Sequence, residues 1–350
     1  MSGDVVDLAV VGLGYWGPNL VRSLHDVPNA RIAQVCDRDR NALERIARRY
    51  PSLATTTSVD EVLEDSTIDA VVIATPVSTH YDLAMAGLRA GKHVLVEKPL
   101  AASLRESVEL VDEAHERGLV LMPGHTFLYS PPVMLVHDLI DAGELGDVYF
   151  VSSSRVNLGL HQPDVSVIWD LGPHDFSILR YWLGERPLSA TAMGRECVVP
   201  GIPDVAFVSL EYPSGAIAHV ELSWLAPSKL RRTTVVGSQK MLVYDDTSSE
   251  PVRLFDAGAS VRDPRTFGEY RMTYRTGDIV SPRVQPVEPL YLELRDFCHA
   301  VQTGAEPRSD VQVGLDVVVT IEAAVRSLKG GGSPEAVEEP HIPLGRTAWR

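Results

Sequence analysis

Along the first third of the chain, short apolar runs alternate with longer segments whose apolar residues recur at helical spacing. This alternation is typical of parallel strands that are joined by crossover helices. We predict strands from five runs: VVDLAVVG, ARIAQVCD, DAVVIAT, KHVLVEK and LVLMPG. The helices predicted between them cover residues 15–26, 40–50, 59–65, 79–90 and 104–117. The pattern therefore predicts an α/β fold with a doubly wound parallel sheet of the Rossmann type.

Two of these predicted helices begin with a capping box. Ser58 is followed three residues later by Glu61, and Ser103 is followed by Glu106. In such a box the hydroxyl and the carboxylate satisfy backbone N–H groups that the first helical turn leaves without partners. The two serines therefore fix where these helices start.

From about residue 147 the pattern changes to shorter alternating runs separated by Gly, Pro and Ser. This is typical of an open, mainly antiparallel sheet, with one hairpin turning at YPSG. A helix over residues 173–183 interrupts the sheet, and helical spacing returns after residue 288. We predict a Rossmann domain over residues 1–124 and an α+β domain over 125–330. Its terminal helices are expected to pack back on the first domain, and residues 331–350 to form a loosely held tail.

Composition narrows the functional classes. The net charge of -15 disfavours nucleic acid and anionic membranes as partners, because proteins that bind polyanions concentrate Lys and Arg on one face. The three cysteines lie far apart without a CxxC pair, so we expect neither a disulfide framework nor a metal site. Acidic residues near the start, where a signal peptide would be basic, favour a cytoplasmic protein.

The sequence VVGLGYWG places Gly12, Gly14 and Gly17 in GxGxxG spacing between a predicted strand and a helix. These glycines allow a tight turn, close approach of a pyrophosphate, and close packing of helix on strand. The next strand ends at Asp37, where a carboxylate can bind the adenosine ribose and repel the extra phosphate of NADP. NAD is therefore the favoured cofactor. NADP is the alternative, because Arg38 can pair with a 2′-phosphate.

Two further motifs, ATPVSTH and VEKPL, follow strands at the carboxyl edge of the predicted sheet, where open α/β sheets bind ligands. Thr75 and Pro76 are placed to contact the ribose or nicotinamide side of a dinucleotide. Lys98 can hold a substrate hydroxyl by a charge-assisted hydrogen bond and steady a developing alkoxide. A solvated lysine at the end of a strand explains the same residue equally well.

The stretch IWDLGPHD supplies a candidate proton acceptor. We interpret Pro173 as the first residue of a helix, which would put His174 close to the helix N-terminus and favour a neutral ring. Asp170 would orient that ring and stabilise the imidazolium formed during reaction. Asp175 would cap or balance the helix dipole, with a substrate contact as the alternative. Trp169 either stacks on a sugar or fills the core.

Together VVGLGYWG, ATPVSTH, VEKPL and WDLGPHD resemble, in order, the glucose-fructose oxidoreductase / inositol dehydrogenase / MocA family, and the resemblance covers nearly the whole chain. It implies an NAD(P)-binding Rossmann domain and a C-terminal domain that carries substrate contacts and often builds dimers or tetramers. It also implies that Lys98 binds the reacting hydroxyl, that the Lys98–Pro99 bond is cis, and that Asp170 and His174 form the DxxxH pair whose histidine accepts the proton.

The chain also departs from the family pattern. It has DVSVIWD where many members have a Gly-Gly-Gly run, and GHTFLY, with His125 and Leu128, where many have GYNxRF. Substrate contacts made there by other members are therefore not transferred. The IWDLGPHD variant is similar to the branch that acts on sugars and nucleotide sugars. His161, in the preceding loop, is a secondary candidate for a substrate contact.

These observations predict an oxidoreductase that transfers hydride between nicotinamide and a secondary alcohol of a sugar or nucleotide sugar, such as the 3-hydroxyl of UDP-N-acetylglucosamine. The alternatives are an inositol or free-sugar dehydrogenase, an NADPH-dependent ketosugar reductase, a redox-assisted glycosidase and a non-catalytic dinucleotide sensor. We assign Lys98, Asp170 and His174 to catalysis, and these three with Trp169 to substrate binding. Cofactor binding is assigned to Gly12, Gly14, Tyr15, Trp16, Gly17, Asp37, Arg38, Thr75, Pro76, His80, Glu97 and Lys98.

Overall fold

The computed structural model describes residues 5–159, 161, 165–261 and 272–340, and it divides the chain into two compact units. The described part of the first unit comprises residues 5–129, 287–319 and 339–340. That of the second unit comprises residues 130–261, 272–286 and 320–338. The first unit thus contains residues 287–319, which lie in the predicted α+β range. Among the described residues, no helix is long and apolar enough to cross a membrane.

The first unit is built on a six-stranded sheet in which every paired strand is parallel, with the order β3-β2-β1-β4-β5-β6. The strands are β1 (Val6–Val11), β2 (Ala30–Cys36), β3 (Ala54–Thr56), β4 (Ala70–Ile73), β5 (His93–Glu97) and β6 (Leu121–Gly124). This order is that of the Rossmann fold, and its direction reverses between β1 and β4. The predicted doubly wound sheet is confirmed; β3 was not among the predicted strands.

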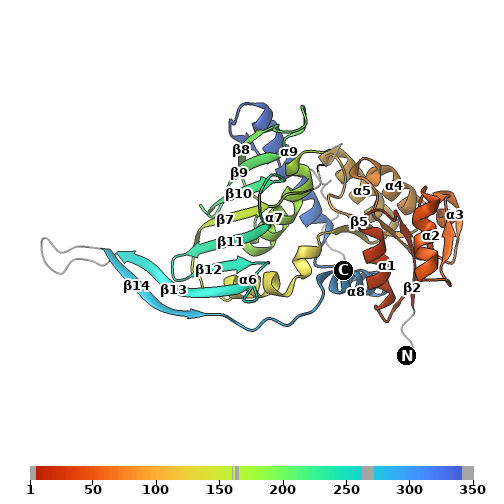
Figure 1. Cartoon of the computed structure of the whole chain (residues 1–350), viewed down its shortest axis with the longest axis horizontal. Helices are drawn as coiled ribbons and strands as arrows, with labels where there is room; N and C mark the ends of the chain where they lie inside the picture. Colours follow the sequence, from red (N-terminus) through yellow and green to blue (C-terminus); the bar gives the residue numbers. More distant parts are fainter. Residues whose placement is uncertain (1–4, 160, 162–164, 262–271, 341–350) are drawn as a thin grey trace, which may run out of the picture. The chain divides into compact units, whose positions relative to one another are not determined.

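Helices enclose this sheet (Figure 1). They are α1 (Gly17–His25), α2 (Arg40–Arg49), α3 (Val59–Glu64), α4 (His80–Arg89), α5 (Leu104–Arg117) and α8 (Pro289–Thr303), with short 3-10 turns η1 (Val77–Thr79) and η2 (Thr126–Tyr129). Central strand β4 is buried throughout because both faces of a parallel sheet are covered. The serine half of each predicted capping box is present: the hydroxyls of Ser58 and Ser103 accept the N–H groups of Glu61 and Glu106. The carboxylate half is wrong at the first box, because the N–H of Ser58 donates to the hydroxyl of Thr56 instead.

The second unit carries a nine-stranded sheet with the order β14-β13-β12-β11-β7-β10-β9-β8-β15. Its strands are β7 (Val148–Val156), β8 (Ser189–Arg195), β9 (Val205–Glu211), β10 (Ile217–Ser223), β11 (Leu230–Gly237), β12 (Met241–Asp245), β13 (Val252–Val261), β14 (Met272–Val280) and β15 (Glu335–Ala336). Only β7 and β10 pair in parallel among these described strands. The expected open, mainly antiparallel sheet is confirmed, as is the hairpin between β9 and β10.

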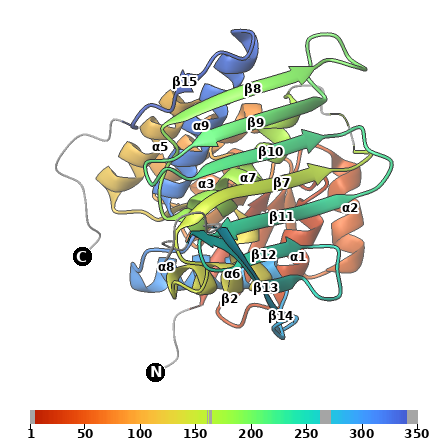
Figure 2. The same cartoon turned by 90° about the vertical axis from the view of Figure 1, so that its left-hand side faces the viewer.

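Helices α6 (Pro131–Asp141), α7 (Val167–Leu183) and α9 (Val311–Lys329) complete the fold. Helix α7 packs on β7, β9 and β10 from one side, and Figure 2 shows the opposite face of these strands without a helix over it. Inward residues of β9 and β10 are buried and outward ones exposed, as expected for a sheet with one solvated face. The unit therefore has a helix-covered face and a bare face.

Two expectations for this unit were wrong. Helix α7 begins at Val167, not at residue 173, so Pro173 lies inside the helix rather than at its first position. The reason is that Val167 and Ile168 are fully buried, so packing extends the helix before the Gly-Pro pair. Part of the predicted loose tail is also held, because β15 pairs with β8 and the N–H of Val337 donates to Leu188. Residues 341–350 of that tail lie outside the described part.

Candidate active site

The glycine loop after β1 has the geometry that a dinucleotide requires. Gly12 has a φ of 96°, and a Cβ there would lie 2.6 Å from the carbonyl oxygen of Ala74. A Cβ on Gly17 would lie 2.1 Å from the carbonyl oxygen of Gly12, so the start of α1 packs directly on the turn. A Cβ on Gly14 would meet nothing within 4 Å. Together with a first turn of α1 that lacks acidic side chains, this open space fits a pyrophosphate.

Asp37 ties the end of β2 to this loop. Its Oδ2 accepts the N–H of Leu13 at 2.5 Å, and its Oδ1 accepts the N–H of Asp39 at 2.7 Å. The carboxylate therefore has a fixed orientation, and each oxygen keeps a lone pair for a ribose hydroxyl. The neighbouring candidates Tyr15, Trp16 and Arg38 are exposed around the loop.

The motif after β4 is connected to the end of β5 through His80. This ring is buried, with Nδ1 at 2.9 Å from the carbonyl oxygen of Pro99 and Nε2 at 2.9 Å from that of Thr75. Burial lowers the pKa of His80, although two carbonyl acceptors favour the imidazolium, which alone donates from both nitrogens. His80 therefore positions the two motifs, whereas Pro76 is exposed and Thr75 half-buried at the surface of the edge.

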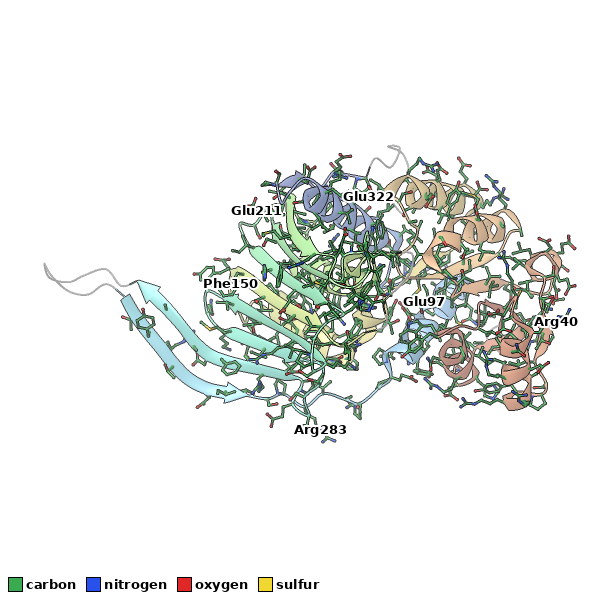
Figure 3. The ribbon with its side chains drawn as sticks, turned by 45° about the horizontal axis from the view of Figure 1, so that its top comes forward. Arg40, Glu97, Phe150, Glu211, Arg283 and Glu322 are labelled. Atoms are coloured by element: carbon green, nitrogen blue, oxygen red, sulfur yellow. The ribbon has the colours of Figure 1, made fainter. Side chains whose placement is uncertain are left out.

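Lys98 lies at the end of β5, half-buried, and its bond to Pro99 is cis, as the family resemblance implied. Its neighbour Glu97, on β5 in Figure 3, is buried, and burial raises the pKa of its carboxyl group. A second buried acid comes from α8: burial, followed by the charge of Glu97, raises the pKa of Glu293. Burial and the charge of Lys98 lower the pKa of His125 to about 3. Glu97 and His125 thus favour their neutral forms beside Lys98, and Glu293 does so beside Glu97.

His125 and Glu293 were not identified from the sequence as part of this cluster. Both nitrogens of His125 and Oε1 of Glu293 are buried without a hydrogen-bond partner among the described atoms. The other Glu293 oxygen accepts the hydroxyl of Thr126 at 2.9 Å. His125 lies in GHTFLY, where the chain departs from the family pattern, and Glu293 lies in no motif. They are far apart in the sequence, so only the fold brings them together.

In the second unit, Asp170 and His174 are one helical turn apart on α7. This spacing places both half-buried side chains on the same face of the helix. Oδ2 of Asp170 accepts the indole N–H of Trp224 at 3.0 Å. Asp170, not His174, lies in the first turn of α7, so the predicted effect of the helix N-terminus on His174 was misplaced. Trp169 is half-buried beside them.

Asp175 has a structural role that the sequence did not indicate. It is buried, forms an ion pair with buried Arg155 on β7, and accepts the hydroxyl of Ser153 at 2.7 Å. The predicted capping role was therefore wrong, because Asp175 lies in the middle of α7 and not at its start. The pair fixes the helix to the sheet one residue away from His174.

The structure thus brings the site candidates together as two groups. The cofactor candidates and Lys98 line the carboxyl edge of the parallel sheet in the first unit, whereas Asp170, His174 and Trp169 share α7 in the second. Comparison with known proteins agrees with this division. The family description "Oxidoreductase family, NAD-binding Rossmann fold" matches residues 6–125, and "GFO/IDH/MocA C-terminal domain" matches residues 133–243.

One relative is D-xylose 1-dehydrogenase (NADP(+)) 2 of Haloferax volcanii, 30% identical over 96% of this chain and 99% of that protein. The chain belongs to the GFO/IDH/MocA oxidoreductase family. Another member, dTDP-3,4-didehydro-2,6-dideoxy-alpha-D-glucose 3-reductase of Streptomyces violaceoruber, is 37% identical over 71% of this chain and 73% of that protein. Among solved structures, GenD2 from gentamicin A biosynthesis, in complex with NAD, has a TM-score of 0.81 and 28% identity, covering 96% of this chain and 97% of its own.

The glycine loop lies within the part of the chain that matches the NAD-binding family description. The first unit is an NAD-binding Rossmann domain, and the chain is an NAD(P)-dependent oxidoreductase of a family that includes dehydrogenases of sugars and of polyols such as inositol. The cofactor and the enzyme class predicted from the sequence are confirmed at this level. The roles of the individual residues stay predictions.

Proposed function

We propose that this protein oxidises a secondary hydroxyl of a sugar or nucleotide sugar, such as the 3-hydroxyl of UDP-N-acetylglucosamine, with NAD as the acceptor. The observation that carries the proposal is the placement of Asp170 and His174 on one face of α7, with the Asp170 carboxylate held by Trp224. An acid that orients a histidine is the arrangement a general base requires. Bound nicotinamide supplies the hydride acceptor.

The chain's own residues divide the remaining work. Lys98 donates a charge-assisted hydrogen bond to the reacting oxygen and stabilises the charge that develops on it. His174 accepts the hydroxyl proton at a ring nitrogen, and Asp170 orients the ring and stabilises the imidazolium. The buried carboxyl group of Glu97 carries no full negative charge while it is protonated, so it does not offset the positive charge of the neighbouring Lys98. His80 contacts the carbonyl oxygens of Pro99 and Thr75, and so holds the backbone next to Lys98 at a fixed distance from Thr75.

The test is a substrate panel of UDP- and dTDP-sugars, inositols and free aldoses, measured with NAD and NADP by the absorbance of the reduced nicotinamide. His174→Ala and Lys98→Met are each expected to lower kcat by at least about 100-fold, as general-base and electrostatic contributions require. Exposed His299→Ala and Lys329→Met are the matched controls and should turn over normally. Near-normal turnover in both active-site variants would contradict the proposal.

The same panel separates the alternatives. The reductase among the relatives supports a second candidate, a ketosugar reductase, which would prefer NADPH and the reverse direction. Activity on inositols alone would favour an inositol dehydrogenase. Tight cofactor binding without turnover would favour a dinucleotide sensor, and turnover with retained NAD and no net absorbance change would favour a redox-assisted glycosidase. The presence of Lys98, Asp170 and His174 together supports a catalyst over a sensor.

Preference for NAD rests on Asp37, whose carboxylate would repel a 2′-phosphate. We expect Asp37→Asn to keep an acceptor for the Leu13 N–H while losing the charge. The ratio of kcat/KM for NAD over NADP should then fall by about tenfold or more, since one unit charge close to a phosphate is removed. An unchanged ratio would show that Asp37 does not select the cofactor.

The proposal also includes a homodimer or homotetramer in the cytoplasm. The bare sheet face of the second unit carries exposed apolar side chains on adjacent strands, among them Phe150, labelled in Figure 3, Ile217, Phe207 and Met193. A patch of this kind on a sheet is typical of an association surface. Phe207→Asp with Ile217→Asp is expected to yield monomers by light scattering, whereas Val5→Asp should not.

The three cysteines are free thiols, which suits the reducing compartment that this proposal includes.

A further inference from the structure

Asp170 is supported by a tryptophan that no sequence motif singled out. Trp224 follows directly after β10, is 1% exposed, and donates its indole N–H to Oδ2 of Asp170 at 3.0 Å. An indole is a donor only and carries no charge, so it fixes a carboxylate without titrating.

The backbone and ring of Trp224 are themselves fixed. Its N–H donates to the carbonyl oxygen of Asp204 at 3.0 Å, and its carbonyl oxygen accepts the N–H of Gly159 at 2.9 Å. A Cβ on Gly159 would lie 3.0 Å from Cδ1 of the indole, so the loop backbone approaches the ring as closely as a residue without a side chain allows. The ring of His161 also lies beside the indole, with the two centroids 5.2 Å apart.

His161 is in turn placed beside a buried charge. Its Nε2 is 3.7 Å from Oδ2 of Asp204, which is fully buried. Burial alone would raise the pKa of Asp204, but the N–H groups of Val198 and Cys197 and the charge of His161 hold it below its usual value. His161, the secondary candidate for a substrate contact, therefore contacts two structural groups: the ionised carboxylate of Asp204 and the indole of Trp224.

We infer that Trp224 is a positioning residue for the reaction. Its indole N–H holds the carboxylate of Asp170 in one orientation on α7, one turn away from His174, and the Asp204–His161 pair holds the indole. The inference rests on the proposed function, because it gives Trp224 an effect only through Asp170 and His174. Among the described residues, Asp175 on α7 and Arg155 on β7 are further charged groups in this part of the unit, and they are paired with each other.

The test is Trp224→Phe, which keeps an aromatic ring and removes the donor. We expect kcat to fall roughly 10- to 100-fold, as for the loss of a hydrogen bond to a charged group, with KM and cofactor binding changed by less than about twofold. Without the indole donor, Asp170 interacts more strongly with an imidazolium at His174. The acid limb of the kcat/KM profile should therefore move to higher pH, a shift that a purely structural role would not produce.

Trp182→Phe is the matched control. Trp182 is also buried in this unit and donates its indole N–H, at 2.9 Å, to the carbonyl oxygen of Val133. It should lower the melting temperature by a similar amount and leave the pH profile unchanged. If Trp224→Phe does not fold, His161→Phe, which keeps the ring contact and removes the imidazole, provides the same readout with an expected kcat loss of about 2- to 5-fold.

A double-mutant cycle distinguishes failure of this inference from failure of the proposed function. With His174→Ala present, Trp224→Phe should lower kcat no further, because residues that act as a unit are not additive. Wild-type kcat and pH profile in Trp224→Phe, or an equal shift in Trp182→Phe, would overturn the role of Trp224. Normal turnover in His174→Ala would overturn the proposed function instead, whatever Trp224→Phe does.

Discussion

The two groups of candidate site residues, one in each unit, hold their ionisable groups in opposite ways. Around Lys98, burial pushes Glu97, Glu293 and His125 toward their neutral forms. On α7, both carboxylates have partners: buried Asp175 has Arg155 and Ser153, and half-buried Asp170 has Trp224. A buried charge is tolerated where it is paired, and a buried acid or base without a pair changes its protonation state instead.

This difference fits the distinct tasks proposed for the two groups. The partners of the carboxylates on α7 give this helix a fixed geometry, which suits the group proposed to align a proton acceptor. Neutralised groups beside Lys98 leave its charge less opposed, which suits an amine that stabilises a developing alkoxide. We therefore expect pH to change the stability of the protein mainly through buried groups of the first unit. Loss of one member of a buried ion pair should lower the free energy of unfolding most strongly in the second unit.

The largest expected effect is that of Arg155→Met. This change leaves the carboxylate of Asp175 buried without its cation, which costs about 3–5 kcal/mol in the free energy of unfolding. Arg231→Met, which breaks the partly exposed pair with Asp246, should cost no more than about 1 kcal/mol. Urea unfolding of both variants measures the contrast. Equal losses would show that the pair on α7 is no stronger than a surface pair.

The next effect concerns His125 and pH. Its pKa in the folded state is about 3, below the ordinary value of 6.5, so the unfolded state binds the proton more tightly between these values. Its contribution to stability is therefore complete above pH 6.5 and is lost as the pH falls toward 3, by up to about 4 kcal/mol. His125→Leu should flatten the fall of melting temperature between pH 6.5 and 4, whereas exposed His299→Leu should not. A parallel fall in both variants would exclude His125 as the cause.

A smaller effect is expected for Glu293→Gln, at a group whose contribution to stability depends on pH in the opposite direction to that of His125. Burial raises the pKa of Glu293, so the folded state binds the proton more tightly than the unfolded state, and stability falls as the pH rises above the ordinary carboxyl range. Glutamine cannot ionise, so the variant should gain melting temperature relative to wild type at pH 8 and match it at pH 5. Exposed Glu306→Gln is the control and should show no such dependence. A wild-type slope in Glu293→Gln would contradict a buried neutral acid.

The sequence predicted the first unit well because its signals are local. Apolar runs end in Gly12, Asp37, Thr75 and Lys98, and each lies at the carboxyl edge of a parallel strand, as the pattern required. Strand β3 was missed because it has only three residues and just one of them is buried. Helix α6 was missed although Ser130 and two prolines mark its start.

What could not be predicted depends on tertiary contacts. The Gly-Pro pair at 172–173 indicates a helix start by local rules, but burial of Val167 and Ile168 outweighs the cost of a proline inside the helix. Likewise, Trp224 is distant in sequence from Asp170, and Glu293 from Glu97. No spacing rule links such pairs, so the residues that support the candidate site become visible only once the sheets are assembled.

The route of the chain through its two units limits how such enzymes can be recombined. The chain passes between the units at residues 129–130, 286–287, 319–320 and 338–339, and helix α9 contributes one part to each. Neither unit corresponds to a single continuous fragment, so a simple fusion of one relative's first half to another's second half would divide both cores. A chimera with a new substrate specificity must instead be built as an insertion, in which residues 130–286 are exchanged together with residues 320–338, which carry the second half of α9 and β15.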